Sequence, residues 1–246
     1  MSFCLGIKVR DGLVAIADTR ITTGSERITA RKLNVYSEGN GTFFVMTSGL
    51  RSVRDKILTY FAEQRQQDEI YSDRLFKIVN RFSDLMRQVA TEDKAYLEES
   101  GLPFNSHVII GGQLSADREH KLYLLYPQGN WIEIGEGSPY QIIGTSSYGK
   151  PVIDRVLTFG DSMEDALKVG VLSFDSTRIS AADVGFPIDV ALYRHGSMSM
   201  IQHRFELADL MDVTQWWQDA LRNALHDLPS EWITQAFRSS QNPANA

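Results

Sequence analysis

The chain has 246 residues, of which 43% are hydrophobic and 23% charged, a balance typical of a folded domain with a sizeable apolar core. Its formal net charge of −6 argues against nucleic acid or an anionic membrane as the main partner. The single cysteine, Cys4, excludes an intrachain disulfide, and no apolar run approaches the roughly 18 residues of a membrane span. Because no leader precedes Ser2, we expect a cytoplasmic protein.

The first half of the chain passes from strand patterns to helical ones. Alternating apolar residues separated by turn dipeptides predict strands at 2–9, 13–18, 32–36 and 42–48. Residues 19–31 are polar and are predicted as loop. After Gly49, apolar residues recur every three or four positions, which predicts a helix at 50–61. A longer apolar stripe predicts a second helix at 72–97, capped by Ser72.

The second half repeats this order. Strands are predicted at 106–112, 120–126, 130–134 and 140–144, with helices at 149–158 and 162–174, the latter beginning at the capping pair Asp161-Ser162. A hairpin at 187–205 and a helix at 214–226 follow. Strands and helices thus come in blocks, which suits an α+β fold in which two stacked sheets carry a helical layer on each outer face.

The expected domain organisation is simple. One domain spans 1–237, with a helical extension from about 206, and the polar tail at 238–246 is expected to be disordered.

Ser2 is the first position with chemical interest. It is small enough to permit removal of Met1, after which one residue would carry both a hydroxyl and a free α-amine. An α-amine has a pKa of roughly 7.7–8.0, so it can act as a base near neutral pH and activate the hydroxyl. Many proteins begin Met-Ser for reasons of processing alone, so Ser2 needs support from other residues.

That support comes from three later positions. Asp18 closes the second strand in Ala17-Asp18-Thr19-Arg20, Lys32 opens the third, and Gly49 ends the fourth in Thr47-Ser48-Gly49-Leu50. Taken singly, the aspartate is a typical strand-end cap, the lysine a solvated charge and the glycine a turn residue. In this order behind Ser2, however, the chain resembles the proteasome β-subunit family of N-terminal-nucleophile hydrolases.

The resemblance is closest to the bacterial branch of that family called Anbu, the ancestral β-subunit. It continues through the segment from Ser180 to Asp189, the helix that follows Trp216-Trp217, and Leu228-Pro229-Ser-Glu-Trp232, so it covers nearly the whole chain. It implies a four-layer αββα sandwich.

The resemblance also implies roles for individual residues. Ser2 would be the nucleophile, where the family more often has threonine, and Lys32 would lie beside its hydroxyl, oriented by Asp18. The backbone N–H of Gly49 would donate to the developing oxyanion.

Six further positions carry weaker implications. Thr145 or Ser146 would supply the serine that the family places near the terminal amine, and Thr22 and Thr47 would border the pocket for the substrate side chain. Ser180 and Asp183 fall where the family usually has aspartate and then serine, so the two residue types are exchanged.

The resemblance therefore implies a peptidase or amide hydrolase of the threonine-type peptidase family, acting on a peptide or amide substrate without a cofactor. It also implies a homo-oligomer, either a ring or an open helical ring. No residue pattern indicates a partner ATPase. The first alternative is a catalytically silent assembly subunit in which Met1 is retained.

A second alternative is a nucleotide-binding loop. Residues 144–150 match Gly-x4-Gly-Lys, but Pro151 stands where such a loop needs Ser or Thr, and the preceding strand belongs to no βαβ unit. A metal site is not expected, because the histidines have no ligand-like spacing; they are His107, His120, His195, His203 and His226.

Overall fold

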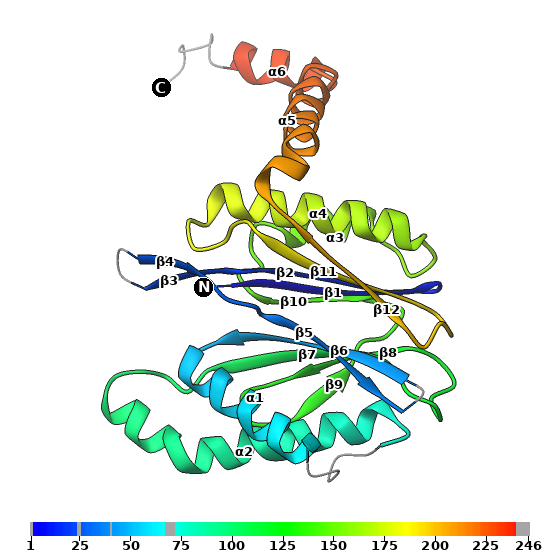
Figure 1. Ribbon diagram of the computed structural model, residues 1–246. Helices are drawn as coiled ribbons and strands as arrows, with labels where there is room; N and C mark the ends of the chain where they lie inside the picture. The colour runs from blue at the N-terminus through cyan, green and yellow to red at the C-terminus, as the bar shows by residue number, and fades with distance from the viewer. Residues whose placement is uncertain (1, 24–25, 40, 67–71, 240–246) are drawn as a thin grey trace. The chain divides into compact units, whose positions relative to one another are not determined.

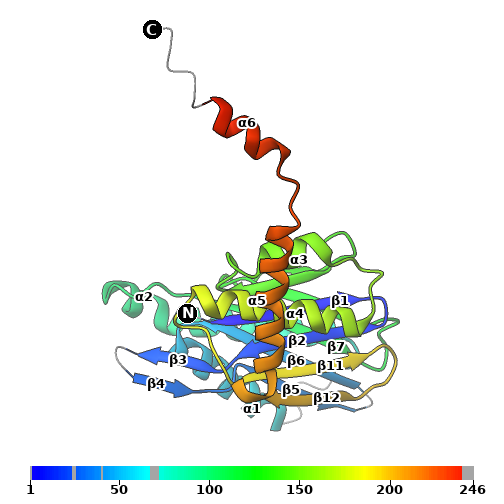
Figure 2. The ribbon, with the colours of Figure 1, turned by 90° about the horizontal axis from the view of Figure 1, so that it is seen from above.

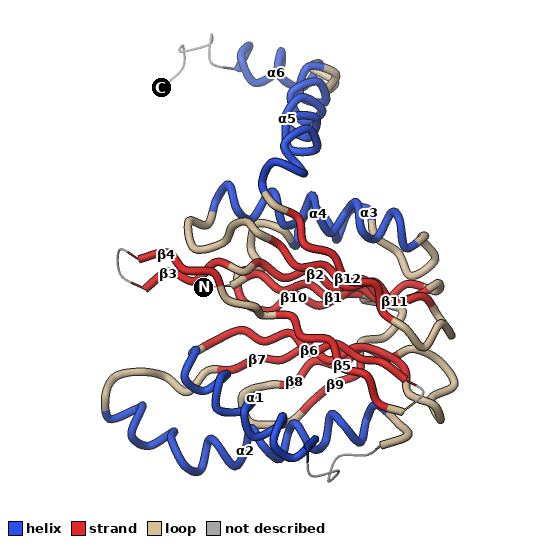
Figure 3. The backbone as a smooth tube through the Cα atoms, in the orientation of Figure 1, coloured by secondary structure: helices blue, strands red, loops and turns tan. Residues whose placement is uncertain are grey.

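The computed structural model describes residues 2–23, 26–39, 41–66 and 72–239, and the chain divides into two compact units, Met1–Ala208 and Asp209–Ala246. In the first unit two five-stranded antiparallel sheets stack face to face between two layers of helices (Figures 1 and 3). The expected four-layer αββα fold is thereby confirmed. The predicted polar tail lies, from residue 240 on, outside the described residues.

The first sheet contains the first two and the last three strands of the sandwich. Its order is β10-β1-β2-β11-β12, with β1 Phe3–Val9, β2 Gly12–Asp18, β10 Tyr140–Gly144, β11 Ile188–Arg194 and β12 Met200–Phe205. Every residue of β1 and β2 is buried, because one face of this hairpin packs on the second sheet and the other on α4 (Figure 2).

The second sheet has the order β5-β6-β7-β8-β9, with β5 Leu33–Glu38, β6 Gly41–Gly49, β7 Ser106–Gln113, β8 Lys121–Leu125 and β9 Trp131–Glu133. Side chains of β6 alternate between its two faces. Phe44 and Met46 enter the core between the sheets, whereas Phe43 and Val45 pack with the helices of the outer layer.

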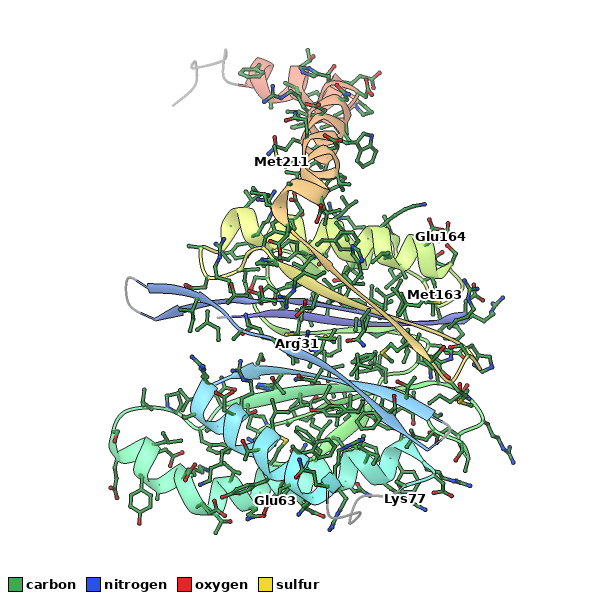
Figure 4. The ribbon with its side chains drawn as sticks, in the orientation of Figure 1. Arg31, Glu63, Lys77, Met163, Glu164 and Met211 are labelled. Carbon is green, nitrogen blue, oxygen red and sulfur yellow. The ribbon has the colours of Figure 1, made fainter. Side chains whose placement is uncertain are left out.

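Four helices complete the sandwich: α1 Arg51–Gln66 and α2 Leu75–Glu99 cover the second sheet, and α3 Lys150–Val156 and α4 Met163–Ser180 cover the first (Figure 1). The apolar stripe of α2 is buried, and side chains fill the layers on both sides of each sheet (Figure 4). Ser162 caps α4 as predicted, accepting a hydrogen bond from the Asp165 N–H at 3.1 Å.

Two local predictions are wrong. Ser72 does not cap α2: its hydroxyl donates to the Arg74 carbonyl, and the Leu75 N–H is instead accepted by Asp117 at 2.9 Å. A distant residue thus satisfies the helix end, which local sequence cannot show. Residues 19–31 are not loop throughout, because Arg20–Thr23 (β3) and Glu26–Thr29 (β4) pair as a hairpin. Both segments contain the β-branched residues Ile and Thr, which favour strands, but their polar residues led to the prediction of a loop.

The second unit is helical. The 3-10 helix η1, Leu207–Leu210, leads from the first unit into α5, Met211–His226, and α6, Glu231–Ser239, follows. The sequence pattern predicted most of α5 but not α6. No residue of α5 is buried, and its apolar residues form a stripe made of Trp217, Leu221, Ala224 and Leu225. Within the described residues, no helix is both long enough and apolar enough to span a bilayer.

The core between α2 and the second sheet should dominate the stability of the sandwich. Phe82 is fully buried and its ring centroid lies 5.1 Å from that of Phe61. Phe82→Ala should lower the free energy of unfolding by about 3–5 kcal/mol, because it removes apolar contacts and leaves a cavity. Denaturant titration measures the loss. The neighbouring exposed change Arg81→Ala is the control, and an equal loss in both variants would contradict this account of the core.

Candidate active site

The entry of the chain into β1 positions Ser2. Its carbonyl accepts a hydrogen bond from the Thr145 N–H at 2.7 Å. Cys4, two residues on, lies in the core between the sheets, so strand alternation directs the Ser2 side chain into the same space. Opposite this point, Gly144 ends β10 with φ +88°, and a Cβ there would lie 2.0 Å from the Ser2 carbonyl oxygen. Only glycine permits so close an approach.

Asp18 and Lys32 form a buried ion pair beside this entry point. The Lys32 Nζ lies 2.6 Å from Asp18 Oδ1, and the two side chains are 1% and 0% exposed. The Phe3 N–H also donates to Asp18 Oδ1, at 2.8 Å. Burial raises the pKa of the Asp18 carboxyl, against the opposing effects of the Lys32 ammonium and the backbone N–H groups of Phe3 and Gly185. The pair therefore ties the chain next to Ser2 to the start of β5.

Arg20 supports the pair from behind, a role that the sequence analysis missed. Its carbonyl accepts from Lys32 Nζ at 2.6 Å, and its Nη1 donates to the carbonyls of Ala182 and Val184 at 3.2 and 3.4 Å. Its guanidinium lies so close to Gly185 that a Cβ there would be 2.2 Å from Arg20 Cζ. Arg20 thus fixes the loop after α4 against the ion pair. The sequence feature that could have indicated this role is the position of Arg20, two residues after Asp18.

Gly49 ends β6 in a conformation that suits glycine. Its φ is +121°, and a Cβ there would lie 2.1 Å from the Asn105 carbonyl oxygen. The same carbonyl accepts the Leu50 N–H at 2.8 Å, and the Thr47 N–H donates to the Lys32 carbonyl at 3.1 Å. These bonds bring the start of α1 next to the start of β5.

A pocket of about 770 Å³ opens where these strand ends meet. Its lining includes Ser2, Lys32, Ser48, Gly49 and Gly144, and α1 contributes Arg51 and Arg54. A pocket of this size is typical of a small-molecule or side-chain binding site. Three of the predicted residues, Ser2, Lys32 and Gly49, therefore line this pocket. A fourth, Asp18, lies behind Lys32 and is paired with it.

Two more groups, one lining the pocket and one in the core between the sheets, have shifted pKa values. Burial lowers the pKa of His107, which lines the pocket and whose Nδ1 lies 3.1 Å from Asn105 Oδ1. Burial raises the pKa of the Cys4 thiol to about 12, so this thiol stays protonated, and its Sγ lies 3.7 Å from the Thr47 carbonyl oxygen. Cys4 is therefore a core residue and not a second nucleophile.

The other predicted residues lie further out. Thr145 is buried next to Ser2 through its backbone bond, whereas Ser146 lines a separate pocket of about 190 Å³. Ser180 is exposed at the end of α4 and Asp183 is half-buried in the following loop, and neither lines the large pocket.

The two threonines expected at the substrate pocket have different outcomes. Thr47 is buried but absent from the pocket lining, where its neighbour Ser48 stands instead. Alternation along β6 accounts for this, since Thr47 shares the face of Val45. The side chain of Thr22 lies outside what the structure describes.

The nucleotide-loop alternative is wrong. β10 pairs antiparallel with β1, so no βαβ unit surrounds residues 144–150. The Lys150 Nζ bonds the Tyr140 hydroxyl at 2.8 Å and Asp154 Oδ1 at 3.1 Å, so its charge is already paired. Among the residues that the structure describes, no three His, Cys, Asp or Glu side chains gather as metal ligands.

The sandwich, together with the pocket at its strand ends, defines a protein of the N-terminal-nucleophile fold class. The model of the family described as "Proteasome subunit" matches residues 2–192. The chain therefore belongs to the proteasome subunit family, as the sequence motifs indicated. No curated protein matches it in sequence.

Solved structures place it close to the Anbu branch. It shares 28% identity and a TM-score of 0.85 with "Anbu (ancestral beta-subunit) from Yersinia bercovieri", over 92% of this chain and 97% of that one. With an Anbu (Gly-1) mutant from Hyphomicrobium sp. strain MC1 it shares 27% identity and a TM-score of 0.85, over 93% of this chain and 99% of that one. With "Helical Assembly of the Anbu Complex from Pseudomonas aeruginosa" it shares 28% identity and a TM-score of 0.87, over 93% of this chain and 97% of that one.

The buried ion pair leads to a prediction about stability. Lys32→Met leaves the Asp18 carboxylate buried without its counter-charge, so the free energy of unfolding at neutral pH should fall by about 3–5 kcal/mol. Since the carboxyl pKa is already raised by burial and rises further without the ammonium, the carboxyl should take up a proton as the pH falls. The deficit relative to wild type should therefore shrink between about pH 7 and pH 4.

Denaturant titrations at several pH values measure this deficit. Lys77→Met is the matched control, because it breaks an exposed lysine–aspartate pair, with Asp73, and should change stability little. A deficit that stays constant with pH would show that the cost arises from packing and not from the unpaired charge.

Proposed function

We propose that this chain is a peptidase or amide hydrolase whose nucleophile is the Ser2 hydroxyl, exposed after removal of Met1. The observation that carries the proposal is that Ser2 and the buried Lys32 line one pocket, with Lys32 fixed by Asp18 and by the Arg20 carbonyl. A nucleophile next to a fixed cation, with a base on the same residue, is the arrangement that acyl transfer needs.

The reaction runs through an ester. The Ser2 oxygen adds to the substrate carbonyl carbon while its proton passes to the free α-amine, which then delivers it to the departing amine as the C–N bond breaks. Water, deprotonated by the same α-amine, attacks the ester, and the acid product leaves with the Ser2 hydroxyl restored. Atoms and charges balance without any cofactor.

Lys32 and Gly49 stabilise the charges that develop. An ammonium has three donors, and two of those on Lys32 are taken by Asp18 and Arg20, which leaves one for the Ser2 oxygen. The Gly49 N–H points to the same strand edge as that of Thr47, two residues back, and lies beyond Leu33, the first residue of β5. It is therefore available to a substrate oxyanion, for which one donor typically contributes about 2.7–4 kcal/mol.

Removal of Met1 decides between this proposal and a silent assembly subunit. With Met1 present, the Ser2 nitrogen is an amide that cannot accept a proton, and one more residue stands before the nucleophile. The intact mass of the purified protein shows which form exists.

The Ser2 assignment is tested by covalent labelling. Processed wild type should react once with a peptidyl β-lactone, and Ser2→Ala should not react, because it lacks the hydroxyl that is acylated. Ser2→Thr should retain labelling. Ser52→Ala, which removes an exposed hydroxyl on α1 outside the pocket lining, serves as the control. Mass spectrometry measures the adduct. Undiminished labelling of Ser2→Ala would sink the assignment.

We also propose that the chain assembles into a homo-oligomer of the ring or open helical type. The relative from Pseudomonas aeruginosa is described as a helical assembly. In this chain large apolar side chains of the second unit are exposed, among them Trp216, Leu225, Trp232 and Phe237 at 61%, 69%, 58% and 70%. Exposed apolar surface of this extent is typical of an interface between subunits.

Assembly should depend on the apolar stripe of α5. Leu221→Asp/Leu225→Asp places two carboxylates in that stripe, so sedimentation at micromolar concentration should show a shift to smaller species. Gln215→Asp/Asn223→Asp, which adds the same charge to the polar side of α5, should assemble as wild type does. Assembly that is unchanged in the leucine variant would remove α5 from the interface.

A further inference from the structure

The large pocket carries an electrostatic bias that the hydrolysis chemistry does not require. Besides Lys32, its lining includes Arg51 and Arg54, while no aspartate or glutamate lines it within the described part of the chain. Lys32 is paired with Asp18 and is committed to the nucleophile. The two arginines lie on α1 and take no part in the acyl-transfer steps.

The geometry of Arg54 is unusual for a surface helix. Its side chain is 9% exposed, and its Nε and Nη2 both donate to Asp55 Oδ1, at 2.8 and 2.6 Å. Its Nη1 has no partner among the described residues. The other carboxylate oxygen of Asp55 accepts from Arg51 Nε at 3.2 Å, so one carboxylate is shared by two guanidinium groups. Asp55 therefore orients Arg51 and Arg54, but its single negative charge does not neutralise both of them.

Two further features favour an anion in this pocket. α1 begins at Arg51, and the free N–H groups and dipole of a helix N-terminus attract negative charge. The remaining wall is largely apolar, with Leu50, Leu124 and Ile142 among its residues. Such a wall suits an aliphatic stem that ends in a charged group.

We infer that this pocket accepts a carboxylate of the substrate, and specifically the side chain of an acidic residue whose own carbonyl is attacked by Ser2. The inference rests on the proposed function, since it assigns the substrate of that same site. The Arg54 guanidinium lines the pocket and is oriented by Asp55, so its positive charge favours a carboxylate over a neutral side chain of the same shape. A free C-terminal carboxylate beyond the scissile bond has the same chemistry and is distinguished by the test.

The experiment uses processed protein and acetylated peptidyl coumarylamides that differ only in the last residue, glutamate, glutamine or leucine. The neutral coumarin leaves no carboxylate beyond the scissile bond. Wild type should give a kcat/KM for glutamate at least about tenfold above that for glutamine. In Arg54→Met this ratio should fall to within about twofold of unity, and Arg54→Lys should restore part of it. The exposed variant Arg81→Met should keep the wild-type ratio.

A second series places the carboxylate elsewhere. Two internally quenched peptides, both with leucine before the scissile bond, are compared. One ends in a free C-terminal carboxylate and the other in a carboxamide. Equal rates support the side-chain assignment, and a preference for the free carboxylate that is lost in Arg54→Met overturns it in favour of a terminal anion. Similar rates for glutamate, glutamine and leucine in wild type overturn the inference alone. No turnover of any substrate and no β-lactone adduct overturn the proposed function, and the inference with it.

Discussion

The site depends on one buried interaction, the ion pair between Asp18 and Lys32. Asp18 ends a strand of the first sheet and Lys32 precedes the first strand of the second, so the pair joins the two halves of the sandwich where their strand ends meet. Two charges taken out of water are costly unless each finds further partners. Here the Phe3 N–H donates a further hydrogen bond to the carboxylate, and the Arg20 carbonyl accepts one from the ammonium. The same bonds that offset this cost also fix the residue next to Ser2.

Backbone conformation supplies the second constraint on the site. Gly144 and Gly49 stand at the ends of strands from different sheets, each with positive φ and each so near a carbonyl that a Cβ would overlap it. At Gly144 the carbonyl is that of Ser2, and at Gly49 it is that of Asn105. Side chains at either place would push the chain away from the pocket. The site is therefore built as much by close backbone approach as by charged side chains.

The sequence predicted those parts of the molecule that depend on local periodicity. The strands of both sheets and the stripe of α2 follow from alternation and helical spacing, and the Ser162 cap from residue type. What the sequence did not predict depends on contacts between distant segments. Asp117 replaces Ser72 at the start of α2 because the loop after β7 lies there, and Arg20 reaches residues more than 160 positions away.

Thr47 as a border of the substrate pocket stays a prediction, and the neighbouring Ser48 lines the pocket that the structure describes. Thr47 and Ser48 differ by one position, and one position decides which face of β6 a side chain occupies. The motif fixed the position of Gly49 but carried no information about the pocket wall, which is formed by residues brought together from both sheets and α1. Family resemblance pointed to Ser2, Lys32 and Asp18 through their order along the chain. It did not point to Arg51 and Arg54, because only the fold shows that they line the pocket.

The proposed function divides the site into a part for catalysis and a part for substrate selection. Ser2, Asp18 and Lys32 are fixed by strand ends and by backbone bonds that tolerate little change. Arg51 and Arg54 lie on the first turn of α1 and contribute their charge to the pocket lining. Asp55 orients both arginines from the same helix, so their geometry is local to α1. Under the proposed function, a change in the side chain that the pocket accepts therefore falls on one helical turn, and the buried pair next to Ser2 stays as it is.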